Sequence, residues 1–260
     1  MNNKKPILIV LGEPNSVFIE ILTKVFKNSY LKSNLKHPII LIGSKKLIHS
    51  QCKKLKKKLN FELLKKNNGN LSKKKLYLID VQYHFKKPFE PITIKSRKYI
   101  ENCFNIALSY LNSAKSDILI NGPVSKKHFL NNKFPGVTEY IFSKSKKKIS
   151  KKPVMLIFNK RLSVSPITTH IPLKNVHKNI NRRSLINQIE TINNFYKKFL
   201  NLKPKIAVIG LNPHCETKTK YNEEQKIILP SIRMLKRKNI KIDGPHSADT
   251  FFLKKNITKY

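Results

Sequence analysis

Short apolar runs recur along the chain, and longer segments with helical spacing separate most of them. The runs predict strands over residues 6–11, 38–42, 76–80, 117–121, 154–158, 164–168, 206–210 and 240–243. Apolar residues at helical offsets predict helices within 18–26, 100–111, 185–200 and 223–238. Strands that alternate with helices favour an α/β fold with a mostly parallel sheet. Several runs are apolar at consecutive positions, as is typical of strands covered on both faces.

Length and composition are those of a globular protein. A chain of 260 residues corresponds to one domain or two small lobes, and 40% hydrophobic residues suffice for a sizeable core. No apolar run is long enough to span a bilayer. The first residues lack the long apolar region and the cleavage site of a signal peptide. We therefore expect no membrane partner and a cytoplasmic location.

Three cysteines, Cys52, Cys103 and Cys215, are far apart in the sequence, and none belongs to a CxxC motif. An odd number without close spacing argues against a disulfide framework and against a zinc site made of thiolates. We expect all three to be reduced thiols.

The formal net charge of +40 is extreme. Such a charge attracts polyanions, so a lysine-rich nucleic-acid-binding protein is one alternative function. However, the lysines are spread along the whole chain, and arginine, the usual reader of bases, is scarce. Asparagine and isoleucine are also abundant, which indicates a compositional drift of the source genome. We expect no specific nucleic-acid partner.

No glycine-rich nucleotide-binding motif is present. The chain has only seven glycines, and neither GxGxxG nor GxxxxGK[ST] occurs, which excludes a Rossmann glycine loop and a P-loop. The sequence NGPVSK at 121–126 follows a predicted strand and opens a predicted helix. A helix N-terminus with Lys126 one turn in is a candidate anion site. The alternative is an ordinary turn with a surface lysine.

Two histidines, His170 and His214, follow apolar runs and have Thr or Asn neighbours. Imidazoles at strand ends commonly bind divalent metals. A catalytic zinc needs three protein ligands, so this pair does not complete a site, and two loop histidines bonded to backbone are the alternative. Asp249 is a candidate base or ligand-orienting carboxylate, or else a helix cap.

Several short motifs occur in a characteristic order. They are GEP at 12–14, NGPVSK at 121–126, PGVTE at 135–139, TTHIPL at 168–173, GLNPH at 210–214 and DGPHSADT at 243–250. Together with Glu216, Glu223 and Glu224 they resemble the 4-hydroxythreonine-4-phosphate dehydrogenase family of the vitamin B6 pathway. The TTHIPL and GLNPH motifs, followed at this spacing by SADT, are the most specific part of the resemblance.

The resemblance implies a two-lobed α/β/α fold like that of isocitrate and isopropylmalate dehydrogenases, in a homodimer. It implies one catalytic unit over 1–260 with lobes at 1–135 and 136–260. The implied cofactors are NAD and a divalent metal, namely Zn, Mg or Co. The implied substrate is a phosphorylated small molecule, 4-phosphooxy-L-threonine. Its oxidation gives a 3-oxo acid, which loses carbon dioxide to give 3-amino-2-oxopropyl phosphate.

The resemblance also implies residue roles. His170 and His214 match two metal ligands, and Thr138 matches a substrate-binding threonine. Lys126 is a further candidate for substrate binding. We place Asn212 in cofactor binding and Asp249 in catalysis.

Some positions depart from the family pattern. Val137 replaces a histidine before the substrate-binding threonine, and Asn15 to Phe18 replace a glycine-rich loop. Residues 217–220 replace further glycines. The family's third metal histidine and its phosphate-binding lysine, asparagine and arginine belong to a segment beyond Tyr260. We therefore expect a truncated, fragmentary or decayed copy with little activity by itself. Another metal- and NAD-dependent decarboxylating dehydrogenase is the second alternative function.

Overall fold

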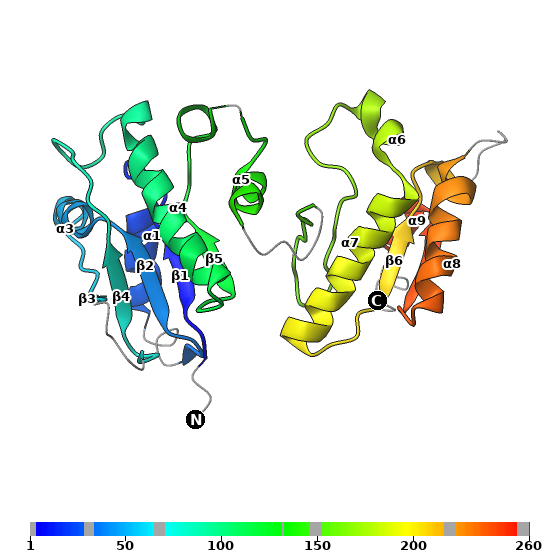
Figure 1. Ribbon diagram of the computed structural model, residues 1–260, viewed down its shortest axis with the longest axis horizontal. Coiled ribbons are helices and arrows are strands. Elements are labelled where there is room, and N and C mark those ends of the chain that lie inside the picture. The colour runs from blue at the N-terminus through cyan, green and yellow to red at the C-terminus, as the bar shows by residue number, and fades with distance from the viewer. Residues whose placement is uncertain are drawn as a thin grey trace. The chain divides into compact units, whose positions relative to one another are not determined.

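The computed structural model describes residues 4–28, 34–64, 71–131, 133–145, 152–215, 222–253 and 260. Contacts divide the chain into two compact units, Met1–Lys148 and Ile149–Tyr260 (Figure 1). Helix α5, Val137–Lys144, contacts α4, Arg97–Asn112, within the first unit. The lobe boundary expected after residue 135 stays a prediction.

The first unit is built on one parallel sheet with the strand order β3-β4-β2-β1-β5. Its strands are β1 Ile7–Val10, β2 Ile39–Gly43, β3 Glu62–Leu63, β4 Leu76–Asp80 and β5 Ile118–Asn121. Four of them were predicted as apolar runs. The edge strand β3 was missed, because it is only two residues long and both are exposed. The prediction of a mostly parallel sheet is confirmed, since every pairing within this sheet is parallel.

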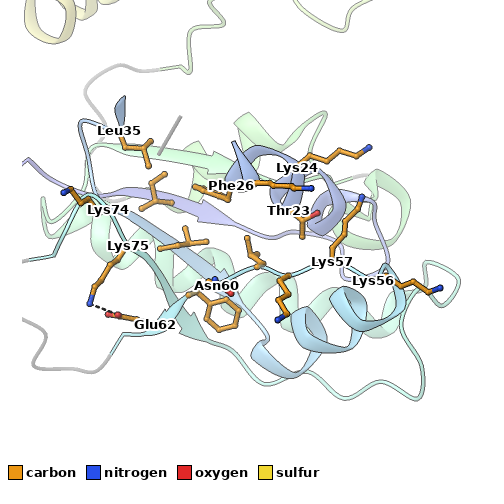
Figure 2. A pocket seen from close by; sticks show the side chains of 16 residues that line it. Thr23, Lys24, Phe26, Leu35, Lys56, Lys57, Asn60, Glu62, Lys74 and Lys75 are labelled. Atoms are coloured by element: carbon orange, nitrogen blue, oxygen red, sulfur yellow. Dashed lines mark ion pairs between the residues drawn. The ribbon is translucent and has the colours of Figure 1, made fainter. Parts of the chain in front are cut away.

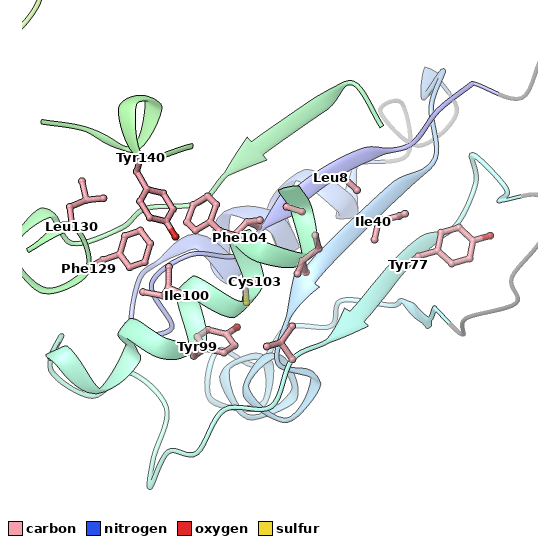
Figure 3. Close-up of a cluster of buried hydrophobic side chains, with 14 residues drawn as sticks. Leu8, Ile40, Tyr77, Tyr99, Ile100, Cys103, Phe104, Phe129, Leu130 and Tyr140 are labelled. Atoms are coloured by element: carbon pink, nitrogen blue, oxygen red, sulfur yellow. The ribbon is translucent and has the colours of Figure 1, made fainter. Parts of the chain in front are cut away.

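Helices cover both faces of this sheet. Side chains alternate along β1 and β2, so Leu8 and Ile40 meet α4 on one face, where Ile100 and Phe104 are fully buried (Figure 3). The other face packs against α1, Phe18–Lys27, and α3, Lys45–Lys54. The two hydrophobic clusters explain why the strands are apolar at consecutive positions.

The second unit has a two-stranded parallel pair, β6 Ile206–Ile209 and β7 Ile242–His246. Helices α7, Arg182–Phe195, and α8, Leu229–Arg237, pack on it through a cluster that includes Leu185, Val208 and Leu235. Shorter helices complete the described parts of both units. They are Ile94–Ser96, Lys126–Leu130, Leu173–Asn175, α6 Val176–Asn179, Tyr196–Leu200, Pro213–Cys215, Glu224–Ile228 and α9 Ala248–Phe251.

Two predicted strands of the second unit are wrong. The runs 154–158 and 164–168 make a single antiparallel bridge, between Ile157 and Val164. Both side chains are exposed, Ile157 at 57% and Val164 at 44%. An apolar run becomes a strand only where neighbouring strands pair with it and other elements cover it. In the described structure these two runs have no strand partner beyond the one bridge, and no other element covers Ile157 or Val164.

Candidate functional site

Lys126 and Thr138 lie in the first unit, after the carboxyl end of β5. The helical turn Lys126–Leu130 begins after Ser125, whose hydroxyl accepts a hydrogen bond from the backbone N–H of His128 at 3.2 Å. Thr138 lies in the first turn of α5. Both side chains are exposed. They are therefore open to a ligand, and their roles in substrate binding stay predictions.

Backbone hydrogen bonds tie the loop before Lys126 to the loop after β1. The N–H of Gly122 donates to Val10 O at 2.7 Å, and the N–H of Glu13 donates to Pro123 O at 2.7 Å. The register of β1 and β5 thus sets the position of the loop that carries Lys126. Ligands of parallel α/β sheets bind at this edge.

Glu13 is a buried carboxyl group at the same edge, and sequence reasoning assigned it no role. Its side chain is 3% exposed, and the Ser96 hydroxyl donates to its Oε2 at 3.0 Å. Its Oε1 is buried without a hydrogen-bond partner among the described residues. Burial raises the pKa of Glu13, and hydrogen bonds from Ser96 and Asn15 and the charge of His128 offset this only in part. An acidic residue in the loop after a buried strand is the signal that would have identified it.

The two candidate metal ligands, His170 and His214, both belong to the second unit and both have left-handed backbones. Their φ angles are 56° and 57°, and Cys215 follows with 58°. Non-glycine residues with positive φ are uncommon and concentrate at functional sites. Both imidazoles are exposed. His214 follows β6, as predicted, whereas the strand expected before His170 is not formed.

His214 pairs with Asp249, which sequence analysis had treated separately. The His214 Nδ1 atom lies 3.0 Å from Asp249 Oδ2, and the Ser247 hydroxyl donates a short hydrogen bond to the same carboxylate. The Ser247 hydrogen bond and the nearby His214 hold the pKa of Asp249 below its ordinary value. A carboxylate with a lowered pKa is a poor general base. The contact instead suits the orientation of the imidazole.

Asn212 lies in a loop organised by Glu224. The backbone N–H groups of Leu211 and Asn212 both donate to Glu224 Oε1 at 2.8 Å, and Asn212 Nδ2 donates to Glu224 Oε2 at 2.8 Å. Glu224 is 1% exposed. Burial alone would raise its pKa, but the hydrogen bonds from Asn212 and Leu211 hold the pKa of Glu224 below its ordinary value. The Asn212 side chain therefore supports the loop before His214, and its role in cofactor binding stays a prediction.

The second unit supplies part of a donor set for a divalent metal. When Nδ1 of His214 carries the ring proton, it donates to Asp249, and Nε2 keeps its lone pair for a metal, as in carboxylate–histidine–metal pairs. Imidazole nitrogen suits zinc and cobalt. Within the described ranges, however, no group of three or more His, Cys, Asp or Glu side chains is placed to hold a metal ion. The two histidines are suitable metal ligands by residue type, but two protein ligands are fewer than the three that a catalytic zinc needs.

The departures from the family pattern differ in their structural consequence. Val137 is half-buried and packs against the cluster on the α4 face. Asn15 is used structurally, because its Oδ1 accepts a hydrogen bond from the N–H of Glu90 at 3.1 Å. Residues 216–220, which include Glu216, lie outside the described residues. The substrate hydrogen bond expected to be lost at Val137 stays a prediction.

No helix in the described parts of the chain is both long and apolar enough to cross a membrane. Cys52 and Cys103 are buried and Cys215 is partly exposed, and none of the three belongs to a disulfide. This agrees with the prediction of reduced thiols.

Comparisons with known proteins agree with these observations. The family model described as pyridoxal phosphate biosynthetic protein PdxA matches residues 34–260. The 4-hydroxythreonine-4-phosphate dehydrogenase of Sulfurihydrogenibium sp. is 36% identical over 251 residues, which are 94% of this chain and 74% of that protein. The Aquifex aeolicus protein of the same name is 29% identical over 96% of this chain and 76% of its own length. The crystal structure of 4-hydroxythreonine-4-phosphate dehydrogenase from Klebsiella pneumoniae superposes with a TM-score of 0.79 at 21% identity, and the match covers 100% of this chain and 79% of that one.

Proposed function

Because the chain belongs to the PdxA family of pyridoxal phosphate biosynthetic proteins, we propose that it is a 4-hydroxythreonine-4-phosphate dehydrogenase. The observation that carries this proposal is the 36% identity to a curated dehydrogenase over 94% of the chain. The match covers about three-quarters of that relative and 94% of this chain, so both units of this chain have counterparts in the relative.

The proposed reaction is the oxidation of 4-phosphooxy-L-threonine. The secondary alcohol would be oxidised to a ketone, with bound NAD supplying the hydride acceptor and a base taking the alcohol proton. The 3-oxo acid then loses carbon dioxide to give 3-amino-2-oxopropyl phosphate. The hydride chemistry belongs to the cofactor, and the contribution of the protein is alignment and charge.

In this proposal His170 and His214 hold the divalent metal, which polarises the reacting oxygen when it is bound. Asp249 acts through His214, since their 3.0 Å contact fixes the ring orientation and leaves Nε2 available. This is a positioning role in place of the catalytic role first assigned to Asp249. It is supported by the lowered pKa of Asp249, which makes this carboxylate a weak proton acceptor.

Lys126 and Thr138 are proposed to bind the phosphorylated substrate from the first unit. The exposed ammonium group of Lys126 follows the loop that is tied to β1, so its backbone is fixed while its side chain is free to reach an anion. Asn212 is proposed to contact NAD through its side-chain oxygen Oδ1, because its side-chain NH2 group and its backbone N–H already donate to Glu223 and Glu224.

A metal-binding assay tests the histidine assignment without relying on turnover. We expect the protein to take up Co²⁺ or Zn²⁺ in competition with a chromophoric chelator, and His170→Ala or His214→Ala to weaken uptake strongly. His177→Ala is the matched control, because His177 is also an exposed histidine of the second unit. Equal metal affinity in all four proteins would remove the metal role of the pair.

Activity is measured separately, as NADH formation from 4-phosphooxy-L-threonine. The low activity expected of the 260-residue chain stays a prediction, and steady NADH formation would contradict it. The expected homodimer and the cytoplasmic location also stay predictions, and the mass measured by light scattering tests the first of them.

A further inference from the structure

A groove lies in the first unit, at the edge of the sheet where the strands begin. Ile39 and Leu76, the first residues of β2 and β4, line it, together with the end of α1 and the loop after α3. Its volume is about 680 Å³, within the range of small-molecule sites. Lys126 and Thr138 follow the opposite, carboxyl edge of the same parallel sheet. The groove is therefore distinct from the proposed substrate-binding residues of this unit.

Seven lysines surround this lysine groove. They are Lys24 and Lys27 of α1, residues 56–58 after α3, and Lys74 and Lys75 before β4. Figure 2 shows Lys24, Lys56 and Lys57 at one end of the groove and Lys74 and Lys75 at the other. The lysines thus lie on the rim of one groove and come from three separate segments of the chain.

Carboxylates neutralise only part of this charge. Lys24 and Lys57 share one oxygen of Glu20, at 3.1 Å and 3.0 Å, and Lys75 pairs with Glu62 at 2.7 Å. Four further lysines have no carboxylate partner within the described part of the chain, namely Lys27, Lys56, Lys58 and Lys74. Seven ammonium groups against two carboxylates leave a local excess of five positive charges. Such an excess in a concave site attracts an anionic ligand.

The floor of the lysine groove is apolar. Ile39, Leu59 and Leu76 are buried members of the cluster between the sheet and α1, and Phe26 and Phe61 are partly buried against it. An inorganic anion would leave this apolar surface in water. A ligand with a flat apolar part would cover the floor while its anionic groups met the lysines.

We propose that the lysine groove binds a nucleoside polyphosphate, with its phosphates on the lysines and its base over the apolar floor. Lysine binds phosphate as a flexible point charge. The limited volume of the groove, about 680 Å³, favours a mononucleotide over a nucleic-acid strand, because strands follow extended basic channels with successive stacking aromatics. This inference goes beyond the proposed dehydrogenase function and does not depend on it.

Calorimetric titration with ADP tests the proposal. The titration is done at about 0.15 M ionic strength, where salt screens the attraction between ADP and lysines more than about 8 Å away. The groove variant is Lys27→Gln/Lys58→Gln/Lys74→Gln. The matched control is Lys86→Gln/Lys98→Gln/Lys133→Gln, which removes the same charge from exposed lysines of the first unit that do not line the groove. We expect the groove variant to bind ADP roughly tenfold more weakly and the control to bind as the wild type does.

Adenosine and pyrophosphate, titrated separately, should each bind more weakly than ADP if the floor and the lysines both contribute. Equal weakening in the two triple variants would overturn the proposal, since net charge alone would then explain the binding. Absence of ADP binding to the wild type at this salt would also overturn it. A short oligothymidylate that bound more tightly than ADP, with a loss confined to the groove variant, would assign the groove to single-stranded nucleic acid instead.

Discussion

Asp249 Oδ2 lies 3.0 Å from His214 Nδ1, so a carboxylate from α9, which follows β7, faces an imidazole from the short helix Pro213–Cys215, which follows β6. Both elements are parts of the second unit. The left-handed backbone of His214, with φ of 57°, points to a fixed imidazole position that the local sequence alone does not favour. The pair is therefore the best-defined part of the candidate site.

Asp249→Asn should weaken metal binding. The amide keeps the size of the side chain but loses the charge that favours a proton on Nδ1, so we expect roughly a 10- to 100-fold loss of Co²⁺ affinity. Asp117→Asn is the control, because Asp117 forms a comparable exposed ion pair with Lys5 in the first unit. An unchanged affinity in Asp249→Asn would show that the carboxylate does not act on the imidazole.

Glu224→Gln should destabilise the second unit at neutral pH. The two backbone N–H donors of Leu211 and Asn212 would lose a buried ionised acceptor, at a cost of about 2 kcal/mol. Glu223→Gln is the control, since Glu223 is less buried and only accepts a bond from the Asn212 side chain. Urea unfolding of both variants measures the difference, and equal midpoints would contradict the prediction.

The pH dependence of the Glu224 contribution follows from its lowered pKa. Because the folded-state pKa lies below the ordinary value of 4.5, the stabilisation is fully present above about that pH. It is lost as the pH falls through the lower folded-state pKa. The stability gap between wild type and Glu224→Gln should therefore be constant near neutral pH and shrink in acid below the ordinary value.

Much of the first unit is predictable from hydrophobic periodicity. Ile100, Phe104, Ala107 and Leu108 repeat at helical offsets, and all four are buried on one face of α4. The same rule failed for 154–158, because an apolar run does not show whether a partner strand exists. Pairing depends on segments distant in the sequence, which periodicity does not report.

The candidate site was only partly predictable. His170, His214 and Asp249 were found as motif residues. The pairing of His214 with Asp249 was not found, because it depends on how the segments after β6 and β7 meet. Glu13 and Glu224 received no role. The importance of Glu13 comes from Ser96, 83 positions away, and from burial, neither of which a local sequence pattern shows.

Glu13→Gln should also alter the pH dependence of stability. The effect should be opposite in sign to that of Glu224→Gln, because the pKa of Glu13 is raised and that of Glu224 is lowered. The pKa of Glu13 is raised above its ordinary value of 4.5 by burial, so its favourable contribution exists at low pH and is lost as the pH rises through the folded-state pKa. Glutamine cannot ionise. We expect the variant to gain stability relative to wild type as the pH rises above the ordinary value of 4.5, measured as the urea midpoint. Glu101→Gln is the control, and parallel pH profiles of wild type and Glu13→Gln would refute the buried-acid interpretation.

Gly210→Ala should destabilise the loop that carries His214. A Cβ at this position would lie 2.5 Å from Cys215 Sγ and 3.2 Å from Glu224 Oε1, so the loop must shift, at a cost of roughly 1–3 kcal/mol. Gly136→Ala is the control, because its Cβ would meet only the flexible end of Glu139, at 2.8 Å. Adding Cys215→Ala removes the closest clash, so the cost of Gly210→Ala should fall in that background. The same cost in both backgrounds, measured by chemical unfolding, would show that the sulfur is not what excludes a side chain at Gly210.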